Sequence, residues 1–337
     1  KKAVEEGYFE TLIREYLLDN PFKAVVILSP ERNLTARQEE KVAEKLTAYK
    51  ASLNEEQIQK LVNATEELEL YQDTPSDPED LAKIPLLKRE DIGKEAEKLN
   101  WTEKREEDIR VLHHNFFTSG IGYLKVLFQT DAVPQEDLCY VGLLKSVLGG
   151  VDTEHYRYSD LTSEIHLNSG GVDISVASYA NLKEPEHFTG ALAAGVRVLY
   201  DRLDFGFEIL EEILCRSVFQ DEKRLAEVLE ETRSRAKMKL ENAGHSTAVS
   251  RATSYFSATA YFNEIVGGTT YFQFLEQICR DFETEKKQVI AKLEEVSRKL
   301  FTRDNMLVSY TADEEGYQRL PQALKKLADR LPAGSGK

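Results

Sequence analysis

A strand followed closely by a helix is encoded by residues 123–150, which read YLKVLFQTDAVPQEDLCYVGLLKSVLGG. The first seven residues alternate as a strand does. Pro134 and several polar or acidic residues then open an apolar helical stripe, and two glycines close it. Many enzymes place catalytic groups at such a step. Here the helix offers Leu138, Cys139, Tyr140, Val141 and Leu144, none of which is an obvious catalyst.

Elements of both kinds surround this stretch. Further strands are expected at 109–112, 172–176, within 188–200 and at 306–311, and helices at about 158–165, 205–219, 222–243, 246–264, 269–300 and 317–330. Strands grouped early, then helices, then a closing strand predict an α+β fold, in which an antiparallel sheet packs against helices. We expect this domain to span residues 106–331, followed by a linker-like tail at 332–337.

The residues before this domain have a different pattern. A helix is predicted over 8–19, ended by Asn20-Pro21, and the apolar run at 23–28 indicates a buried strand. These two elements are typical of the end of a preceding α+β domain, which we place at 1–30.

A charged helical stretch at 34–72, broken at Ser52-Leu53-Asn54, predicts an αα-hairpin. Its second helix can begin with a capping box formed by Ser52 and Glu55, or by Asn54 and Gln57. We interpret residues 31–105 as a long helical hairpin linker.

The length and charge exclude several classes of function. A chain of 337 residues suggests two domains by default. The 59 acidic residues exceed the 44 basic ones, for a net charge of −15. This balance argues against partners such as nucleic acid or an anionic membrane, because phosphate binding requires clustered Lys and Arg. It would attract basic peptides, although an acidic balance that keeps the chain in solution explains it equally well.

The cysteines and the start of the sequence give information on the cellular compartment of the chain. Cys139, Cys215 and Cys279 each lie in an apolar helical stripe without a CxxC spacing, which predicts buried free thiols in a reducing compartment. No apolar run is long enough to cross a membrane, and no signal peptide is visible. We expect a cytoplasmic chain. Because the sequence begins at Lys1 without methionine, we also expect an excised piece from which a targeting segment could be missing.

Catalytic signatures are absent from the sequence. The six histidines form neither HExxH nor HxxEH, and no GxSxG, GxxxxGK[ST] or GxGxxG occurs. His113 and His114 are adjacent in a strand and should point to opposite faces. Glu154-His155 and Glu186-His187 are expected in solvated loops. Cys139 lies near a helix start, where a thiol pKa can fall, but a small core residue is the preferred interpretation. We therefore predict no catalytic, metal-binding or cofactor-binding residue in this chain.

The polar residues that most suggest a binding site are His245, Arg251 and Tyr255. His245 lies near a helix start and could cap it, while Arg251 lies six residues later and therefore not on the same helical face. Tyr255, Phe256, Tyr261 and Phe262 form an aromatic-rich face, for which core packing is favoured over contact with a peptide. His245, Arg251 and Tyr255 remain the candidates for contacts in a peptide chamber.

Five segments are informative as an ordered set: YFETLIREYLLDNPFKAVVILSPER at 8–32, IPLLKREDI at 84–92, TSGIGYLKVLFQTD at 118–131, GHSTAVSRATSYFS at 244–257 and FTRDNMLVSYTADEEGY at 301–317. In this order they resemble presequence-protease-type zinc metallopeptidases, a branch of the pitrilysin/insulinase clan. The resemblance implies four related α+β domains, paired into two halves that a helical hairpin joins around a chamber for unfolded peptides.

The resemblance also implies where the chemistry would lie. Zinc would be held in the first domain by HxxEH and a later Glu, where it would activate water with the HxxEH Glu as general base. The last domain would add an Arg and a Tyr in an RxxGGAY-like pattern. Neither pattern occurs in this chain. The helix at 134–150 would then be a structural copy of the zinc helix, and the chain a non-catalytic middle portion that binds no catalytic zinc and cleaves nothing alone.

Two other interpretations stay open. The chain could be a standalone inactive partner subunit, or a binding module, that pairs with a separate catalytic peptidase chain. It could also be an unrelated enzyme that uses Cys139 or the region of His245 and Arg251. The resemblance implies as partners the remaining domains of the parent peptidase and unstructured peptides.

Overall fold

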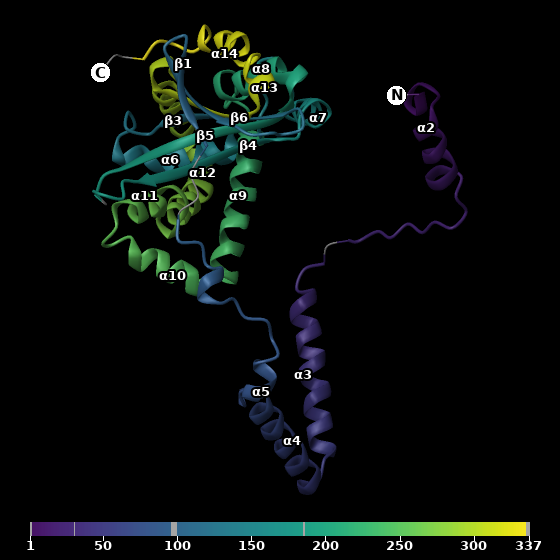
Figure 1. The fold of residues 1–337 in the computed structure, drawn as a ribbon. Coiled ribbons are helices and arrows are strands. Elements are labelled where there is room, and N and C mark those ends of the chain that lie inside the picture. The colour runs from purple at the N-terminus through teal and green to yellow at the C-terminus, as the bar shows by residue number, and fades with distance from the viewer. Residues whose placement is uncertain (1, 30, 96–99, 185, 335–337) are drawn as a thin grey trace. The chain divides into compact units, whose positions relative to one another are not determined.

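The computed structural model describes residues 2–29, 31–95, 100–184 and 186–334 (Figure 1). The chain divides into two compact units, Lys1–Ala96 and Glu97–Lys337. The predicted boundaries at residues 30, 105 and 331 stay predictions.

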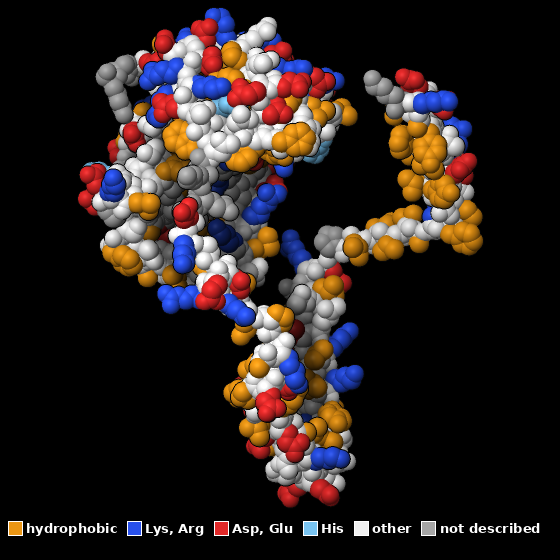
Figure 2. All heavy atoms as spheres, viewed as in Figure 1, with side chains coloured by type: hydrophobic (Ala, Val, Ile, Leu, Met, Phe, Trp, Pro, Cys, Tyr) orange, Lys and Arg blue, Asp and Glu red, His pale blue; other side chains and the backbone are white. Residues whose placement is uncertain are grey.

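The first unit is helical. None of its described residues is buried, and apolar side chains lie along its surface (Figure 2). Its elements are α1 (Lys2–Glu5), α2 (Tyr8–Ile13), the π-helix η1 (Arg14–Leu18), α3 (Leu34–Ser52), α4 (Glu55–Asp73), α5 (Pro78–Leu81) and the 3-10 helix η2 (Arg89–Asp91).

The turn between α3 and α4 resolves the capping alternative. The Asn54 side chain accepts a hydrogen bond from the Gln57 backbone N–H at 2.9 Å, and the Gln57 side chain accepts from the Asn54 N–H at 3.0 Å. Ser52 instead donates its hydroxyl to the Tyr49 carbonyl at 2.7 Å. The capping box is therefore formed by Asn54 and Gln57.

The predicted buried strand at 23–28 is not formed. These residues have no regular secondary structure, and Val25, Val26, Ile27 and Leu28 are 79–91% exposed. A strand needs a neighbour to receive its backbone hydrogen bonds. None of the described strands pairs with this segment, so its apolar side chains are left in solvent.

The second unit is built on a six-stranded sheet with the order β1-β2-β6-β3-β5-β4 (Figure 1). Its strands are β1 (Thr102–Glu106), β2 (Ile109–Asn115), β3 (Ile121–Gln129), β4 (Val172–Ala180), β5 (Phe188–Leu199) and β6 (Met306–Ala312). All neighbouring strands are antiparallel except β2 and β6. Because β6 inserts between β2 and β3, which run in opposite directions, it must be parallel to one of them.

Strand β1 was not predicted. Its sequence, TEKRE, is entirely polar or charged and shows no apolar alternation. It forms a hairpin with β2 through Glu107 and Asp108, whose φ angles are 51° and 67°. Two consecutive positive φ angles are typical of the turns that match the twist of a hairpin. The turn and the pairing with β2 therefore establish a strand that its own side chains do not indicate.

The helices pack around this sheet, and one large core joins them to it. They are α6 (Leu138–Val147), α7 (Tyr158–Asn168), α8 (Leu203–Cys215), α9 (Glu222–Asn242), α10 (Gly244–Thr253), α11 (Ala258–Gly267), α12 (Thr269–Leu300), α13 (Glu314–Tyr317) and α14 (Leu320–Ala328), with the 3-10 turns η3 (Gln135–Asp137), η4 (Tyr200–Arg202) and η5 (Arg303–Asn305). The α+β class is thus confirmed, with a mixed sheet in place of the antiparallel one expected.

The single helix expected at 246–264 is two helices, α10 and α11. The Ser257 side chain accepts a hydrogen bond from the Ala260 N–H at 3.3 Å and so starts α11 with a cap. Ser254 donates its hydroxyl to the Arg251 carbonyl at 2.7 Å, at the end of α10. Both serines satisfy backbone groups that a continuous helix would pair internally.

Helix α6 contains the apolar residues predicted to form a helical stripe within 134–150. Val141, Leu143, Leu144 and Val147 are fully buried. Gly142 lies so close to α11 that an added Cβ would collide with the Val266 carbonyl oxygen, and Tyr271 donates its hydroxyl to the Gly142 carbonyl at 3.2 Å. The helix is a packing element.

The three cysteines differ in exposure. Burial raises the pKa of Cys139 and of Cys279 to about 11, so both stay protonated near neutral pH. Neither is a nucleophile in this state. Cys139 and Cys279 are half-buried, and Cys215, the last residue of α8, is exposed by its surface area, so none of the three is the fully buried thiol predicted. The surrounding residues nevertheless desolvate the Cys215 sulfur as well and raise its pKa to about 11.

His113 and His114 point to opposite faces of β2, as expected, since His113 is buried and His114 is half-buried. The Nε2–H of His113 donates to the Ala312 carbonyl at 3.0 Å, while Nδ1 has no hydrogen-bond partner among the described residues. Burial lowers the pKa of His113 below 6.5, the Ala312 bond raises it, and the charge of Lys104 lowers it. The net effect favours a neutral ring in the folded chain.

The buried ring of His113 makes stability depend on pH. Below pH 6.5 the unfolded chain binds a proton at this position that the folded chain resists, so the free energy of unfolding should fall as the pH decreases. We expect the loss between about pH 8 and about pH 5, measured by urea unfolding, to be smaller in His113→Phe. His245→Gln, which removes an exposed histidine, should leave the loss unchanged. An equal loss in all three proteins would contradict this assignment.

Candidate functional site

Helices α10 and α11 and the first turn of α12 are held together by one buried carboxylate. Glu264 is 3% exposed, and its Oε1 accepts hydrogen bonds from Arg251 Nη1 at 3.0 Å, from the Thr270 N–H at 2.8 Å and from the Thr270 hydroxyl at 3.3 Å. Negative charge at the N-terminus of a helix is favourable. Glu264 therefore joins the three helices and pairs the charge of Arg251.

Of the three predicted site residues, two lie together near Glu264 and one lies apart. Arg251 lies 5.3 Å from the centre of the Tyr255 ring, so these two are brought together. His245 is exposed at the start of α10, makes no capping hydrogen bond and does not line the cavity that contains Arg251 and Tyr255. His245 and Arg251 are six residues apart and therefore lie on different faces of α10, as expected, which places His245 away from this cavity.

The aromatic residues expected to share one face differ in burial. Phe262 is buried and packs on Phe188 with ring centres 5.5 Å apart. Tyr255 and Phe256 are 76% and 80% exposed, and Tyr261 accepts a hydrogen bond from Gln135 Nε2 at its hydroxyl. Core packing is therefore wrong for Tyr255 and Phe256, because the break between α10 and α11 turns them outward.

These exposed rings line an open cavity of ≈ 740 Å³, which we call the aromatic cavity. Arg251, Tyr255, Phe256, Tyr261 and Glu186 contribute to its wall. Apolar rings together with the charged side chains of Arg251 and Glu186 suit a ligand that has both apolar and polar groups.

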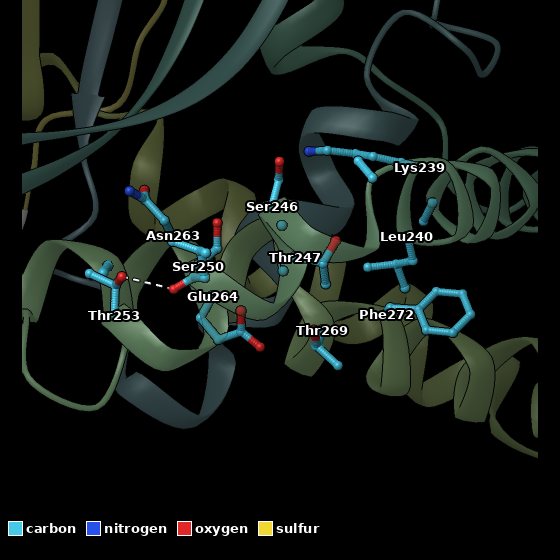
Figure 3. A pocket seen from close by; sticks show the side chains of 16 residues that line it. Lys239, Leu240, Ser246, Thr247, Ser250, Thr253, Asn263, Glu264, Thr269 and Phe272 are labelled. Atoms are coloured by element: carbon cyan, nitrogen blue, oxygen red, sulfur yellow. Dashed lines mark hydrogen bonds between the residues drawn. The ribbon is translucent and has the colours of Figure 1, made fainter. Parts of the chain in front are cut away.

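A second cavity of ≈ 380 Å³ lies between the end of α9, helices α10 and α11, and the start of α12, and we call it the four-helix cavity (Figure 3). Apolar residues such as Leu240 and Phe272 line it together with polar ones that include Lys239, Ser246 and Asn263. The sequence analysis missed this cavity. The one local signal for it is the adjacent pair Gly267-Gly268, which lies in the cavity wall where α11 meets α12.

The remaining histidines form local contacts. Glu154 and His155 are exposed in a loop, as expected. The end of α8 also brings charged partners to this loop, since His155 Nδ1 lies 2.9 Å from Oε2 of the buried Glu212, and Glu154 pairs with Arg216. His187 is exposed and lies 3.1 Å from the exposed Glu184. These contacts are local, and among them the one between Glu154 and Arg216 is an ion pair whatever the protonation of the histidines.

A catalytic zinc site requires at least three His, Cys, Asp or Glu ligands that converge on one point. Within the described residues, no three His, Cys, Asp or Glu side chains come close enough to hold a metal ion. The donors in this part of the chain do not fit a catalytic zinc, so no chemical step is derived through one. No described helix is both long and apolar enough to span a membrane.

Comparisons with known proteins agree with this picture. The family model described as associated with peptidase M16, subfamily C, matches residues 28–278. The HypA protein of Clostridium perfringens is 32% identical over 98% of this chain and 34% of its own length. Presequence protease 1, chloroplastic/mitochondrial, of Arabidopsis thaliana is 27% identical over 98% of this chain and 31% of its own length. The chain thus spans about a third of these relatives.

Solved structures support the fold. A peptidase M16 inactive domain from Pseudomonas fluorescens superposes with a TM-score of 0.51 at 13% identity, over 71% of this chain and 52% of that one. The predicted resemblance to presequence proteases is confirmed by the family model and the sequence relatives.

Proposed function

Because the chain belongs to the family associated with peptidase M16, subfamily C, we propose that it is the non-catalytic middle portion of a zinc metalloendopeptidase that degrades unstructured peptides. The observation that carries the proposal is the alignment of 98% of this chain with about a third of a presequence protease. In this role the second unit supplies part of the wall of a peptide-enclosing chamber. The catalytic Zn²⁺ would lie in the N-terminal half of the parent, outside this chain.

The aromatic cavity supports a contact with peptides. Tyr255 and Phe256 present large apolar rings to solvent beside the Arg251–Glu264 pair. Exposed aromatic side chains can bind apolar side chains of an unfolded peptide without requiring a particular sequence. Of the three predicted contact residues, Arg251 and Tyr255 keep this role in the proposal, whereas His245 does not line the aromatic cavity as the described residues form it.

The proposal includes the partners and the location. Residues 1–30 would complete a preceding domain, residues 31–105 would link two halves as a hairpin, and the remaining domains of the parent would be the partners. Neither nucleic acid nor membrane is proposed as a partner, in keeping with the net charge of −15. A cytoplasmic location stays part of the proposal, although several relatives are named as mitochondrial or chloroplastic proteases.

A standalone inactive partner subunit is the alternative. The coding sequence on both sides of this segment distinguishes the two. An HxxEH upstream in the same reading frame and an RxxGGAY-like stretch downstream would place the chain within one peptidase, whereas a start and a stop codon at its ends would make it a separate subunit.

Binding and cleavage by the purified chain test the proposal directly. We expect it to bind an unstructured, dye-labelled peptide in fluorescence anisotropy without cleaving it in mass spectrometry. The double variant Tyr255→Ala, Phe256→Ala should weaken binding by about 10-fold, because two exposed apolar rings are lost. Tyr179→Ala removes an exposed ring on β4 that does not line the aromatic cavity and serves as the control. Stoichiometric zinc together with chelator-sensitive cleavage by the pure chain would overturn the proposal.

A further inference from the structure

The two edges of the six-stranded sheet differ in how well they are protected (Figure 1). Strand β1 has five residues, TEKRE, which are all polar or charged. Strand β4 has nine residues, VDISVASYA, with one charged side chain and neither lysine nor proline. Short length, lysine and proline are features that prevent a sheet edge from pairing with another strand. The β1 edge has two of these features, whereas the β4 edge has none.

The hydrogen bonds of β5 show which backbone groups of β4 face outward. Gly190 of β5 accepts a hydrogen bond from the Thr130 N–H, next to β3, at 2.9 Å. The Arg197 N–H of β5 donates to the Gly171 carbonyl, next to β4, at 3.3 Å. Even-numbered residues of β5 therefore bond to β3 and odd-numbered ones to β4. The register pairs odd-numbered residues of β4 with odd-numbered residues of β5. The even-numbered residues of β4 thus direct their N–H and C=O groups away from the sheet, and up to position 178 these are Val172, Ile174, Val176 and Ser178.

These outward groups are unpaired in the described part of the chain. No described residue outside β5 forms a hydrogen bond with the backbone of β4. The residues from Ile174 to Ser178 are half-buried, whereas the β5 residues opposite them are buried. A row of unpaired donors and acceptors that is partly open to solvent can receive one more strand.

A cavity lies at each end of this edge. The first has a volume of ≈ 280 Å³, and we call it the strand-start cavity because Val172 and Ile174 line it, together with Ile165 of α7 and Ile213 of α8. The second is the aromatic cavity, which Glu186 lines from the loop between β4 and β5. A strand added beside β4 would direct every second side chain to the face on which Val172 and Ile174 pack against the core. One of these side chains can therefore enter the strand-start cavity.

A peptide fits this edge better than a second copy of the chain. Two copies, each with a net charge of −15, repel each other. A peptide in extended conformation pairs through its backbone, so it needs no particular sequence. It can also continue beyond β4 toward the aromatic cavity, where contact with apolar side chains is already proposed.

We propose that an unstructured peptide binds along the free edge of β4 as a seventh strand of the sheet. Its backbone would pair with the outward N–H and C=O groups between Val172 and Ser178, and an apolar side chain would enter the strand-start cavity. This inference rests on the proposed function and deepens it, because it gives the peptide a binding mode that depends on the backbone and not on the sequence.

Amide hydrogen exchange, followed by NMR on the full 337-residue chain, tests the pairing residue by residue. The probe is a peptide of leucine, serine and glutamine residues that is as long as β4. When this peptide saturates the chain, exchange at the outward amides of Ile174 and Val176 should slow by about 10-fold or more. The inward amides of Ser175 and Ala177, which β5 already pairs, should change much less and serve as the control.

Peptides with a modified backbone separate strand pairing from side-chain contacts. Three dye-labelled forms of the same peptide are compared by fluorescence anisotropy: unmodified, N-methylated at every second residue, and N-methylated along the whole length. An added strand uses the N–H groups of only one of its edges, so the second form should bind nearly as tightly as the first. The third form should bind about 10-fold more weakly, because neither edge can donate hydrogen bonds.

The outcomes distinguish this inference from the proposed function. Equal binding of all three forms, or unchanged exchange at the outward amides while the peptide is bound, would overturn strand pairing and leave the peptide contact intact. Slower exchange that requires no peptide and increases with the concentration of the chain would assign the edge to a second copy and would also overturn the inference. Binding of none of the three forms would remove both the binding mode and the peptide contact proposed for this chain.

Discussion

Gly142→Ala is expected to destabilise the chain by about 3 kcal/mol, although alanine is the better helix former. An added Cβ would collide with the backbone carbonyl of Val266 and lie 2.9 Å from Cε2 of Tyr271. A backbone carbonyl cannot move away as a flexible side chain can, so α6 and α11 must separate. That separation would also stretch the hydrogen bond from the Tyr271 hydroxyl to the Gly142 carbonyl. Urea unfolding followed by circular dichroism measures the change.

Gly267→Ala is the matched control, since it makes the same substitution in helix α11. A Cβ on Gly267 would meet only the Lys145 amine, at 4.0 Å. The gain in helix propensity should then leave stability unchanged or raise it by up to about 1 kcal/mol. If both substitutions had the same effect, close packing of α6 would not be what requires Gly142.

Glu264→Ala is expected to destabilise the chain by roughly 2 to 4 kcal/mol. The substitution leaves the Thr270 N–H at the start of α12 without its acceptor, inside a region where Glu264 is 3% exposed. The ion pair with Arg251 contributes less, at most about 1 kcal/mol, because the Arg251 side chain is 43% exposed and water replaces part of the interaction. Most of the loss should therefore come from the backbone donor.

A double-mutant cycle separates these two contributions. Arg251→Ala should cost less than Glu264→Ala, and the coupling between them should stay near about 1 kcal/mol. Glu230→Ala, which removes an exposed glutamate that pairs with Arg233 on α9, should change stability by less than about 0.5 kcal/mol. A cost for Arg251→Ala equal to that of Glu264→Ala would instead make the ion pair the main interaction.

Local periodicity accounts for the elements that the sequence predicted well. The limits of α12, Thr269–Leu300, agree with the predicted 269–300, because its buried residues recur every three or four positions over the whole length. Strand β4 was evident from the alternation of Val172, Ile174 and Val176. In both cases the pattern that predicts the element is contained within the element itself.

Elements that depend on distant partners were not predicted. Polar β1 is a strand because β2 receives its hydrogen bonds, and apolar residues 23–28 have no strand among the described ones to pair with. The same limit applies to the site. Gln135 and Tyr261 are far apart in the sequence, and only the folding of the chain brings them into hydrogen-bond contact beside the aromatic cavity.

The α+β class, the family resemblance, most helix and strand limits and the apolar character of α6 are all evident before folding is considered, because composition and periodicity are local properties of the chain. Only the folded chain shows the parallel pairing of β2 with β6, the outward position of Tyr255 and Phe256, and the burial of Glu264. These features depend on which surfaces meet across long separations in the chain, and burial and charge pairing are properties of such meetings rather than of any one segment.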